Sequence, residues 1–167
     1  APVICLMGPT ASGKTDIAIN LSEEFPIDII SVDSALVYRD MNIGTAKPDD
    51  KMLKLYPHAL VNIRDPEDTY SVGDFVNDVE KKIRHSHEKK RIPFLVGGTM
   101  MYFRSLMQGI AKLPEANQSL RMIINEEANQ IGWPAMHAKL SDVDPFSAKR
   151  INKNDSQRIQ RAIEVFR

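Results

Sequence analysis

The sequence predicts an α/β fold in which helices flank a parallel sheet, followed by a helical segment after about residue 110. Two observations support this prediction. Short apolar runs alternate with longer segments of helical periodicity in the first part of the chain, and no strand-like run remains after Gly109. Strands that alternate with helices form βαβ units, which build parallel sheets whose ligands gather at the carboxyl ends of the strands.

Four strands are expected, at residues 2–7, 27–33, 59–63 and 92–96. The second is a continuous β-branched run that ends in an acid, which is typical of a strand buried on both faces of a parallel sheet. Helical periodicity predicts helices at 14–24 and 71–91, and the second of these begins with a capping box formed by Ser71 and Asp74.

Beyond Gly109 the expected elements are all helical, at residues 115–131, 135–140 and 156–167. This pattern predicts an α/β core at residues 1–110, a helical insertion at 111–150, and a helix at 151–167 that returns to the core.

The composition limits the possible classes of protein. With 167 residues, 43% of them hydrophobic, the chain is long enough for a globular domain with its own core. Lys plus Arg and Asp plus Glu both total 22, so no overall basic excess indicates nucleic-acid binding. The one cysteine, Cys5, is expected to be a small buried hydrophobic residue. With no leader-like segment and no run of about 20 apolar residues, a cytoplasmic protein without a membrane segment is expected.

The segment "GPTASGKT" at 8–15 matches a phosphate-binding loop, because it directly follows a predicted strand and opens a predicted helix. Its glycines let the backbone wrap around an anion, Lys14 adds a positive charge, and Thr15 offers a hydroxyl to Mg²⁺. The pattern predicts a P-loop NTPase-like site for a diphosphate or triphosphate, and nothing in it demands ATP. The site residues are Gly8, Pro9, Thr10, Ala11, Ser12, Gly13, Lys14 and Thr15.

Asp33 is the acid that closes a predicted strand near this loop. An NTPase normally adds a metal-binding aspartate at the end of a second strand, but the run at 92–96 is followed by "GGT". Asp33 could bind a metal, accept a proton from a nucleophile, or cap the following turn. The role of general base is favoured.

Two segments near the expected site carry further candidates. Residues 34–47 are expected to grip a substrate through Tyr38, Arg39 and Lys47, with a plain surface connection as the alternative. Residues 97–103 begin with two glycines that permit close backbone approach, and they supply Thr99 as a hydroxyl at the edge of the sheet. The apolar side chains of this segment are expected to pack in the core; they are Met100, Met101 and Phe103.

Residues 147–167 form a modest basic patch. Gln157 and Arg161 lie four apart on one helical face, and Ile159, Ile163 and Phe166 lie on another. The polar face is either a solvated surface or a contact for a polyanion.

The chain resembles a known family, the tRNA dimethylallyltransferases, also called tRNA isopentenyltransferases. The matching segments are "GPTASGKT", "SVDSALVYRDMNIGTAKP", "RIPFLVGGTMMYF" and "DPFSAKRINKNDSQRIQRAIEVF", which follow the family's order and cover nearly the whole chain. The resemblance implies transfer of a dimethylallyl group from dimethylallyl diphosphate to N6 of the adenosine 3′-adjacent to the anticodon, at position 37, in tRNAs that read codons starting with U.

The resemblance also implies roles for residues of this sequence. The loop would hold the diphosphate with Mg²⁺ on Thr15, Asp33 would be the general base at the acceptor amine, and Thr99 would help to position the reacting groups. Residues 111–150 would be an incomplete tRNA-contacting insertion in a monomeric enzyme. Contacts with the tRNA anticodon stem-loop are implied for Asp33, Ser34, Ala35, Leu36, Thr99, Arg121, Gln157, Arg158, Ile159, Gln160 and Arg161.

Two departures from the family pattern stand out. Many members carry Gln where this chain has Leu36, which puts a side-chain contact to the base in doubt there. Family members also continue well past the position of Arg167. Three other readings stay open: a P-loop kinase of small molecules, a prenyltransferase acting on free adenine nucleotides, and a non-catalytic nucleotide-binding module.

Overall fold

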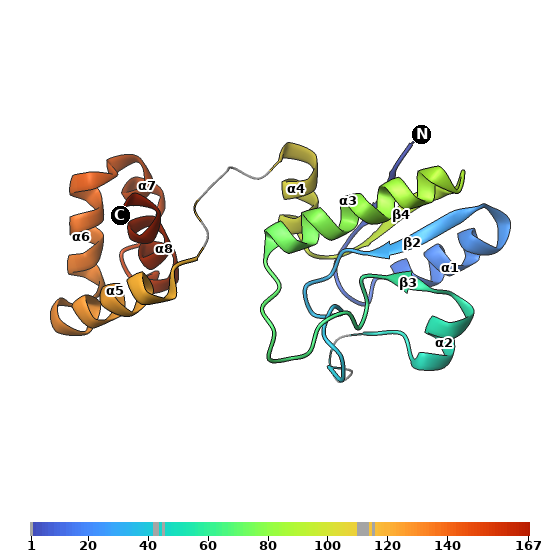
Figure 1. Cartoon of the computed structure of the whole chain (residues 1–167), viewed down its shortest axis with the longest axis horizontal. Helices are drawn as coiled ribbons and strands as arrows, with labels where there is room; N and C mark the ends of the chain where they lie inside the picture. Colours follow the sequence, from blue (N-terminus) through green and yellow to red (C-terminus); the bar gives the residue numbers. More distant parts are fainter. Residues whose placement is uncertain (1, 42–43, 45, 110–113, 115) are drawn as a thin grey trace. The chain divides into compact units, whose positions relative to one another are not determined.

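The structure is a computed structural model that describes residues 2–41, 44, 46–109, 114 and 116–167. The chain divides into two compact units, Ala1–Ile110 and Ala111–Arg167. Each unit has its own secondary structure (Figure 1) and its own buried core.

The first unit is built on a parallel sheet of four strands. These are β1 (Ile4–Met7), β2 (Ile27–Ser31), β3 (His58–Ala59) and β4 (Ile92–Gly97), and they lie in the order β1-β4-β2-β3. Ile29 in β2 pairs with Phe94 of β4 on one side and with His58 of β3 on the other. The predicted α/β fold with a parallel sheet is confirmed.

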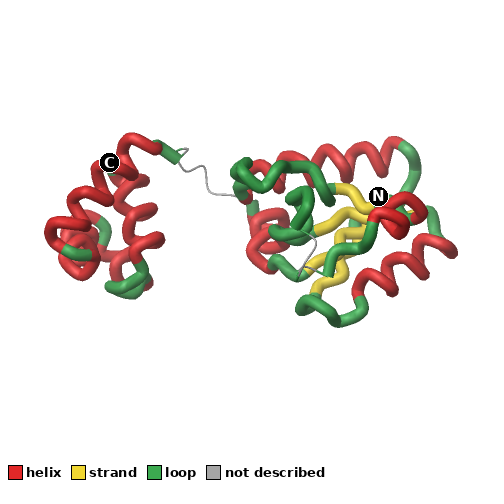
Figure 2. Tube along the Cα trace, turned by 90° about the horizontal axis from the view of Figure 1, so that it is seen from below, coloured by secondary structure: helices red, strands yellow, loops and turns green. Residues whose placement is uncertain are grey.

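Helices cover both faces of this sheet (Figure 2). Helix α1 (Lys14–Glu24) packs on one face, where Ala18 meets Ile29 and Phe94. Helices α3 (Val72–Glu88) and α4 (Met100–Gln108) pack on the other face, where the rings of Phe75 and Tyr102 stack with their centroids 4.2 Å apart. The predicted capping box at the start of α3 is present. This arrangement sends all four strands toward the loops that carry the candidate site.

Three strands differ from expectation. Strand β2 ends at Ser31, so Asp33 follows the strand by two residues and does not close it. Strand β3 has two residues instead of the predicted 59–63, because Leu60 and Asn62 adopt left-handed φ angles of 65° and 55° that end the extended run. Strand β1 lies at the edge of the sheet, so Ile4 and Cys5 are exposed. The expectation of a buried Cys5 was therefore wrong.

A short helix, α2 (Asp50–Leu55), was not predicted. The Asp49 side chain accepts a hydrogen bond from the backbone N–H of Met52 and caps this helix. Six residues are too few for a helical period to appear in the sequence.

The second unit is helical, as predicted. It consists of α5 (Gln118–Ile131), α6 (Trp133–Val143), α7 (Pro145–Arg150) and α8 (Ser156–Phe166). Ile124, Met136, Ile159 and Ile163 form its centre. The expected three-part division stays a prediction, but the buried residues of α8 pack within the second unit, with α5 and α6.

Candidate functional site

The predicted phosphate loop joins β1 to α1 and turns sharply at two left-handed residues, Ala11 with φ 61° and Gly13 with φ 77°. Its first residue is fixed to the neighbouring strand, because the N–H of Gly8 donates to the carbonyl of Gly97 over 3.3 Å. The Lys14 ammonium folds back across the loop and donates to the Pro9 carbonyl and to Ser12 Oγ, the latter at 3.1 Å. An anion bound in the loop would replace the Pro9 and Ser12 oxygens as the acceptor of the Lys14 hydrogen bonds.

Thr99 ties the end of β2 to the end of β4. Its Oγ1 accepts a hydrogen bond from the N–H of Ser34 at 3.0 Å and lies 3.4 Å from Ser34 Oγ, and its N–H donates to the Val32 carbonyl at 3.2 Å. The two chains approach so closely that a Cβ built on Gly97 would lie 1.9 Å from the Val32 oxygen. The predicted pair Asp33 and Thr99 is thus brought together by the backbone between them.

Asp33 caps the turn that follows it. Its Oδ1 accepts hydrogen bonds from the N–H groups of Ala35, at 2.8 Å, and Leu36, at 3.4 Å. Among the described residues, no hydrogen bond engages Oδ2, so one carboxylate oxygen remains available to a ligand. Asp33 therefore has the capping role that the sequence left open, and its Oδ2 can still accept a proton.

A cavity of about 60 Å³ joins the loop to the strand ends. Its lining includes Thr10, Lys14 and Thr15 from the loop and α1, together with Asp33 and Leu36 from the segment after β2. A wider hollow of about 300 Å³ lies around the loop residues 11–15. The structure therefore gathers the predicted phosphate-binding residues and the predicted base at one place.

Two residues that the sequence reasoning missed line the same cavity: Ser31, the last residue of β2, and His58, the first residue of β3. Ser31 was hidden in an apolar run, and His58 stands before the run that was expected to be the strand. Only the pairing of β3 with β2 reveals that they share a site.

The side chains that line the cavity suit a metal ion whose ligands are mainly water molecules and substrate oxygens. The described part of the chain contains no group of three His, Cys, Asp or Glu side chains that could hold a metal ion. Thr15 contributes a hydroxyl to the cavity. Mg²⁺ typically keeps several waters and takes substrate phosphates as ligands, so one protein hydroxyl beside a phosphate loop suits it.

In the segment 34–47, the side chains that were expected to bind a substrate make contacts within the protein instead. Lys47 Nζ donates to the Tyr38 carbonyl at 2.6 Å and to Asn62 Oδ1 at 2.8 Å, and Arg39 pairs with Asp65 at 2.6 Å. Burial lowers the pKa of Lys47. These contacts favour the alternative of a surface connection, although residues 42, 43 and 45 lie outside the described part of the chain.

The apolar side chains after Thr99 divide between core and surface. Phe103 is buried, as expected, whereas Met100 and Met101 are 47% and 59% exposed, so the expectation that they pack in the core was wrong. Both lie at the start of α4, on its outer face.

In the second unit, two of the three arginines expected at tRNA form a cluster around a buried acid. Arg121 donates to both carboxylate oxygens of Glu164 at 3.0 Å, and Arg161 Nη1 lies 2.7 Å from Glu164 Oε2. Burial alone would raise the pKa of Glu164, but the hydrogen bonds from Arg121, Arg161 and the N–H of Asn117 outweigh it and lower the pKa to about 2. Both arginine side chains remain about one-third exposed.

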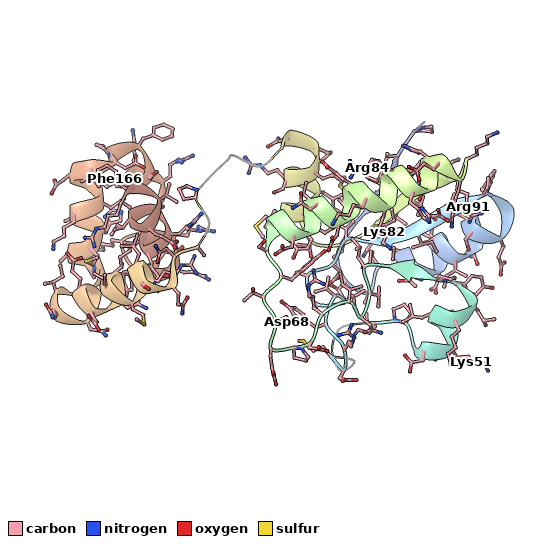
Figure 3. All side chains as sticks on the ribbon, in the orientation of Figure 1. Lys51, Asp68, Lys82, Arg84, Arg91 and Phe166 are labelled. Carbon is pink, nitrogen blue, oxygen red and sulfur yellow. The ribbon has the colours of Figure 1, made fainter. Side chains whose placement is uncertain are left out.

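The other predicted contact residues on α8 behave differently. Gln157 and Arg158 are exposed, and Gln160 Nε2 donates to Asn125 Oδ1 at 2.7 Å. The Ile159 side chain has no exposed surface and packs in the core of the second unit, and the expected tRNA contact at this residue stays a prediction. Phe166, expected to lie with Ile159, is 57% exposed at the end of the helix (Figure 3).

A larger cavity, of about 550 Å³, lies away from the phosphate loop, along β2 and β3 and beside α3. The Arg91 guanidinium, labelled in Figure 3, pairs there with Asp28 at 2.5 Å. Because its lining includes none of residues 8–15, it is not the predicted site. Among the helices of the described residues, none has the length and apolar character needed to cross a membrane.

Comparison with known proteins places these features in a family. The sequence model of the IPP transferase family matches residues 36–167. The chain is 54% identical over 166 residues to tRNA dimethylallyltransferase 2 of Hahella chejuensis and 52% identical to tRNA dimethylallyltransferase of Cupriavidus taiwanensis. The alignments include 99% of this chain but 50% and 52% of those proteins, so the chain spans about half the length of the curated relatives it matches.

Comparison with solved structures leads to the same family. The crystal structure of the full-length tRNA isopentenylpyrophosphate transferase from Bacillus halodurans is 37% identical, with a TM-score of 0.63 over 98% of this chain and 54% of that one. A eukaryotic dimethylallyltransferase, captured in crystallographic snapshots acting on tRNA, is 27% identical, with a TM-score of 0.81 over 98% of this chain and 41% of that one. With the phosphate loop, Asp33 and Thr99 assembled at the strand ends, and with the family match over most of its length, this chain belongs to the IPP transferase family.

Proposed function

We propose that the protein transfers a dimethylallyl group from dimethylallyl diphosphate to N6 of the adenosine 3′-adjacent to the anticodon, position 37, of cytoplasmic tRNAs that read codons starting with U. The observation that carries the proposal is that one cavity is lined by Lys14 and Thr15 of the phosphate loop and by Asp33 from the segment after β2. The names of the relatives support tRNA as the acceptor and dimethylallyl as the transferred group.

The residues of this chain would divide the reaction between them. The C1–O bond of the prenyl diphosphate breaks and pyrophosphate leaves with the electron pair, while a new bond forms between C1 and N6. The loop amides and the Lys14 ammonium stabilise the charge that develops on the leaving pyrophosphate. Asp33 Oδ2 accepts the proton released by N6, and Oδ1 keeps its two hydrogen bonds to the turn.

Positioning should supply much of the rate, because an exocyclic amine is a weak nucleophile. Thr99 would hold the segment of Asp33 and Ser34 against β4 through its hydrogen bond to the N–H of Ser34. Mg²⁺, bound through Thr15 and the diphosphate, would neutralise phosphate charge. The exposed Gln157 and Arg158 and the partly exposed Arg121 and Arg161 would contact the tRNA.

The test is prenyl transfer to an anticodon stem-loop RNA by the Asp33→Asn variant. Because this chain spans about half of its relatives, the same change is also made at the matching position of the Hahella chejuensis protein. The transfer rate should fall by about 10²- to 10⁴-fold, since the proton acceptor is lost. The affinity for the prenyl diphosphate should change less than about twofold, because binding does not use that proton.

Asp68→Asn is the matched control, since Asp68 is an exposed carboxylate in the loop before α3 (Figure 3). It should transfer at the wild-type rate. Undiminished transfer by Asp33→Asn would remove Asp33 from the mechanism. Phosphoryl transfer from ATP without prenyl transfer would point to a kinase.

A further inference from the structure

Two buried polar atoms in the candidate site have no hydrogen-bond partner among the described residues: Ser31 Oγ and His58 Nε2. Ser31 is only 4% exposed. Leaving such a group unsatisfied is energetically costly, so native proteins normally supply a partner from solvent or from a ligand. Both residues line the cavity that also contains Lys14 and Thr15.

The sheet places these two side chains on the face that α1 covers. Ile29 and Ser31 are two residues apart in β2 and therefore point to the same face, and His58 stands directly opposite Ile29 in β3. Ile29 packs against Ala18 of α1. The amino end of that helix, which carries Thr15, therefore adjoins the unpaired atoms in the shared cavity.

The hydrogen bonding of His58 defines what its free nitrogen can do. Nδ1 lies 2.7 Å from the Tyr56 carbonyl, which can only accept, so Nδ1 carries the proton. Burial lowers the pKa of His58, which keeps the ring neutral. Nε2 therefore presents a lone pair to the cavity and needs a donor. The Ser31 hydroxyl, which lines the same cavity, can donate or accept.

A diphosphate bound in this site cannot satisfy Nε2, and the Lys14 ammonium in the cavity already donates to the Pro9 carbonyl and to Ser12 Oγ. An ionised diphosphate offers only acceptor oxygens. A water molecule bound to a divalent cation, in contrast, is a strong donor, and Mg²⁺ keeps several such waters in proteins. Direct coordination of Mg²⁺ by the imidazole is disfavoured, because Mg²⁺ prefers oxygen ligands.

We propose that His58 and Ser31 form an outer-sphere site for the divalent cation, in which His58 Nε2 and Ser31 Oγ hold a water molecule bound to the cation that accompanies the diphosphate. This inference rests on the proposed function in one respect, namely that the loop binds a diphosphate with its cation. His58 is then a positioning residue: it fixes the cation relative to Thr15 without touching the substrate.

The experiment is calorimetric titration of this chain with inorganic pyrophosphate, once with Mg²⁺ present and once with a chelator. His58→Leu removes the acceptor, and His58→Gln offers a carbonyl oxygen in its place. With Mg²⁺, His58→Leu should weaken pyrophosphate binding about 10-fold, the lower end of the losses seen for residues that orient metal ligands, and His58→Gln should recover most of it. With the chelator, all variants should bind alike.

His85→Leu is the matched control, because His85 is an exposed histidine on α3 with 57% of its side chain accessible. It should leave both titrations unchanged. If His58→Leu does not fold, Ser31→Ala carries the test, since it removes one atom and should weaken only the Mg²⁺-dependent binding, by about 3-fold.

Equal binding by wild type and His58→Leu with Mg²⁺, or an equal loss with and without Mg²⁺, would overturn the inference and leave the proposed function standing. Failure of the wild-type chain to bind pyrophosphate under either condition would overturn both. The two failures are therefore distinguishable within one set of titrations.

Discussion

Gly97 sets the distance between β2 and β4 at the site. A methyl group at residue 97 would lie 1.9 Å from the Val32 carbonyl oxygen. The atoms that it would meet are backbone atoms of Val32, which cannot shift at low energetic cost. Gly97→Ala should therefore destabilise the first unit by about 3 kcal/mol, as overpacked sites do. It should also loosen the Gly8 N–H contact with residue 97 and weaken pyrophosphate binding. Chemical denaturation and calorimetry measure the two effects.

Gly73→Ala provides the control for this substitution. Gly73 lies in the first turn of α3, where an added methyl would meet Ser71 Oγ at an ordinary 3.5 Å. This change should raise the stability by about 0.5–1 kcal/mol, because it restricts the unfolded chain. Similar stability of the two variants would contradict the proposed close approach at Gly97.

At the residue scale, the sequence predicted those site residues whose role is set by their neighbours in the chain. The loop around Lys14 works through local backbone geometry, so a short motif identifies it. His58 acquires its place only through pairing with Ile29, and no local pattern carries that information. Cys5 was misjudged for the same reason, because burial of an apolar strand depends on whether it lies at the edge of the sheet.

Helix α8 is held to the start of α5 by the charge cluster at Glu164. Glu164 is 5% exposed, and its carboxylate accepts from Arg121, Arg161 and the N–H of Asn117. Glu164→Gln leaves two guanidinium groups without their counter-charge, and breaking a buried pair in this way costs about 3–5 kcal/mol. We expect a loss of about 3 kcal/mol in the unfolding free energy of the second unit at neutral pH.

Glu127→Gln is the comparison for this variant. Glu127 also has two cationic partners, Lys139 and Arg167, but it lies at the surface with 24% of its side chain exposed. Surface pairs contribute about 0–1 kcal/mol, so the loss should be no larger than that. An equal loss in both variants would show that the burial of Glu164 is unimportant.

The same cluster should make the second unit sensitive to acid. The pKa of Glu164 is lowered in the folded state from 4.5 to about 2, so its contribution to stability is complete above pH 4.5 and is lost as the pH falls toward 2. Wild-type stability should drop across this window more steeply than that of Glu164→Gln. Denaturation midpoints followed through Trp133 fluorescence at a series of pH values measure the difference, and parallel curves would contradict the assignment.

At the element scale, periodicity predicted the long helices and the long strands. It missed α2 and α7 because each has six residues, less than two helical turns. It overextended β3 because the left-handed conformations of Leu60 and Asn62 have no sequence signal of the kind that glycine gives. The strand ends that carry the site were predicted to within two residues: β2 ends at Ser31, before the predicted Asp33, and β4 ends at Gly97, one residue beyond the prediction.

For the whole molecule, the two separate cores predict that ligand binding stabilises only the first unit. All residues of the phosphate loop belong to the first unit, and the single tryptophan of the chain, Trp133, packs against the core of the second. Pyrophosphate with Mg²⁺ at about 100 times its Kd should stabilise the first unit by about 2.7 kcal/mol. Circular dichroism should show this shift, while the Trp133 fluorescence transition stays in place. An equal shift in both signals would mean that the chain unfolds as one cooperative unit.

The central claim is that the phosphate loop of this chain serves a prenyl diphosphate. Its most direct test is calorimetric titration of the chain, with Mg²⁺, against dimethylallyl diphosphate and separately against ATP. Two variants accompany it: Lys14→Ala, which removes the loop ammonium, and Lys51→Ala, which removes an exposed lysine of α2 (Figure 3). We expect tighter binding of the prenyl diphosphate than of ATP, a loss of at least about 10-fold in Lys14→Ala because a charge-assisted contact disappears, and no change in Lys51→Ala. A clear preference for ATP, with no response to dimethylallyl diphosphate, would contradict the account.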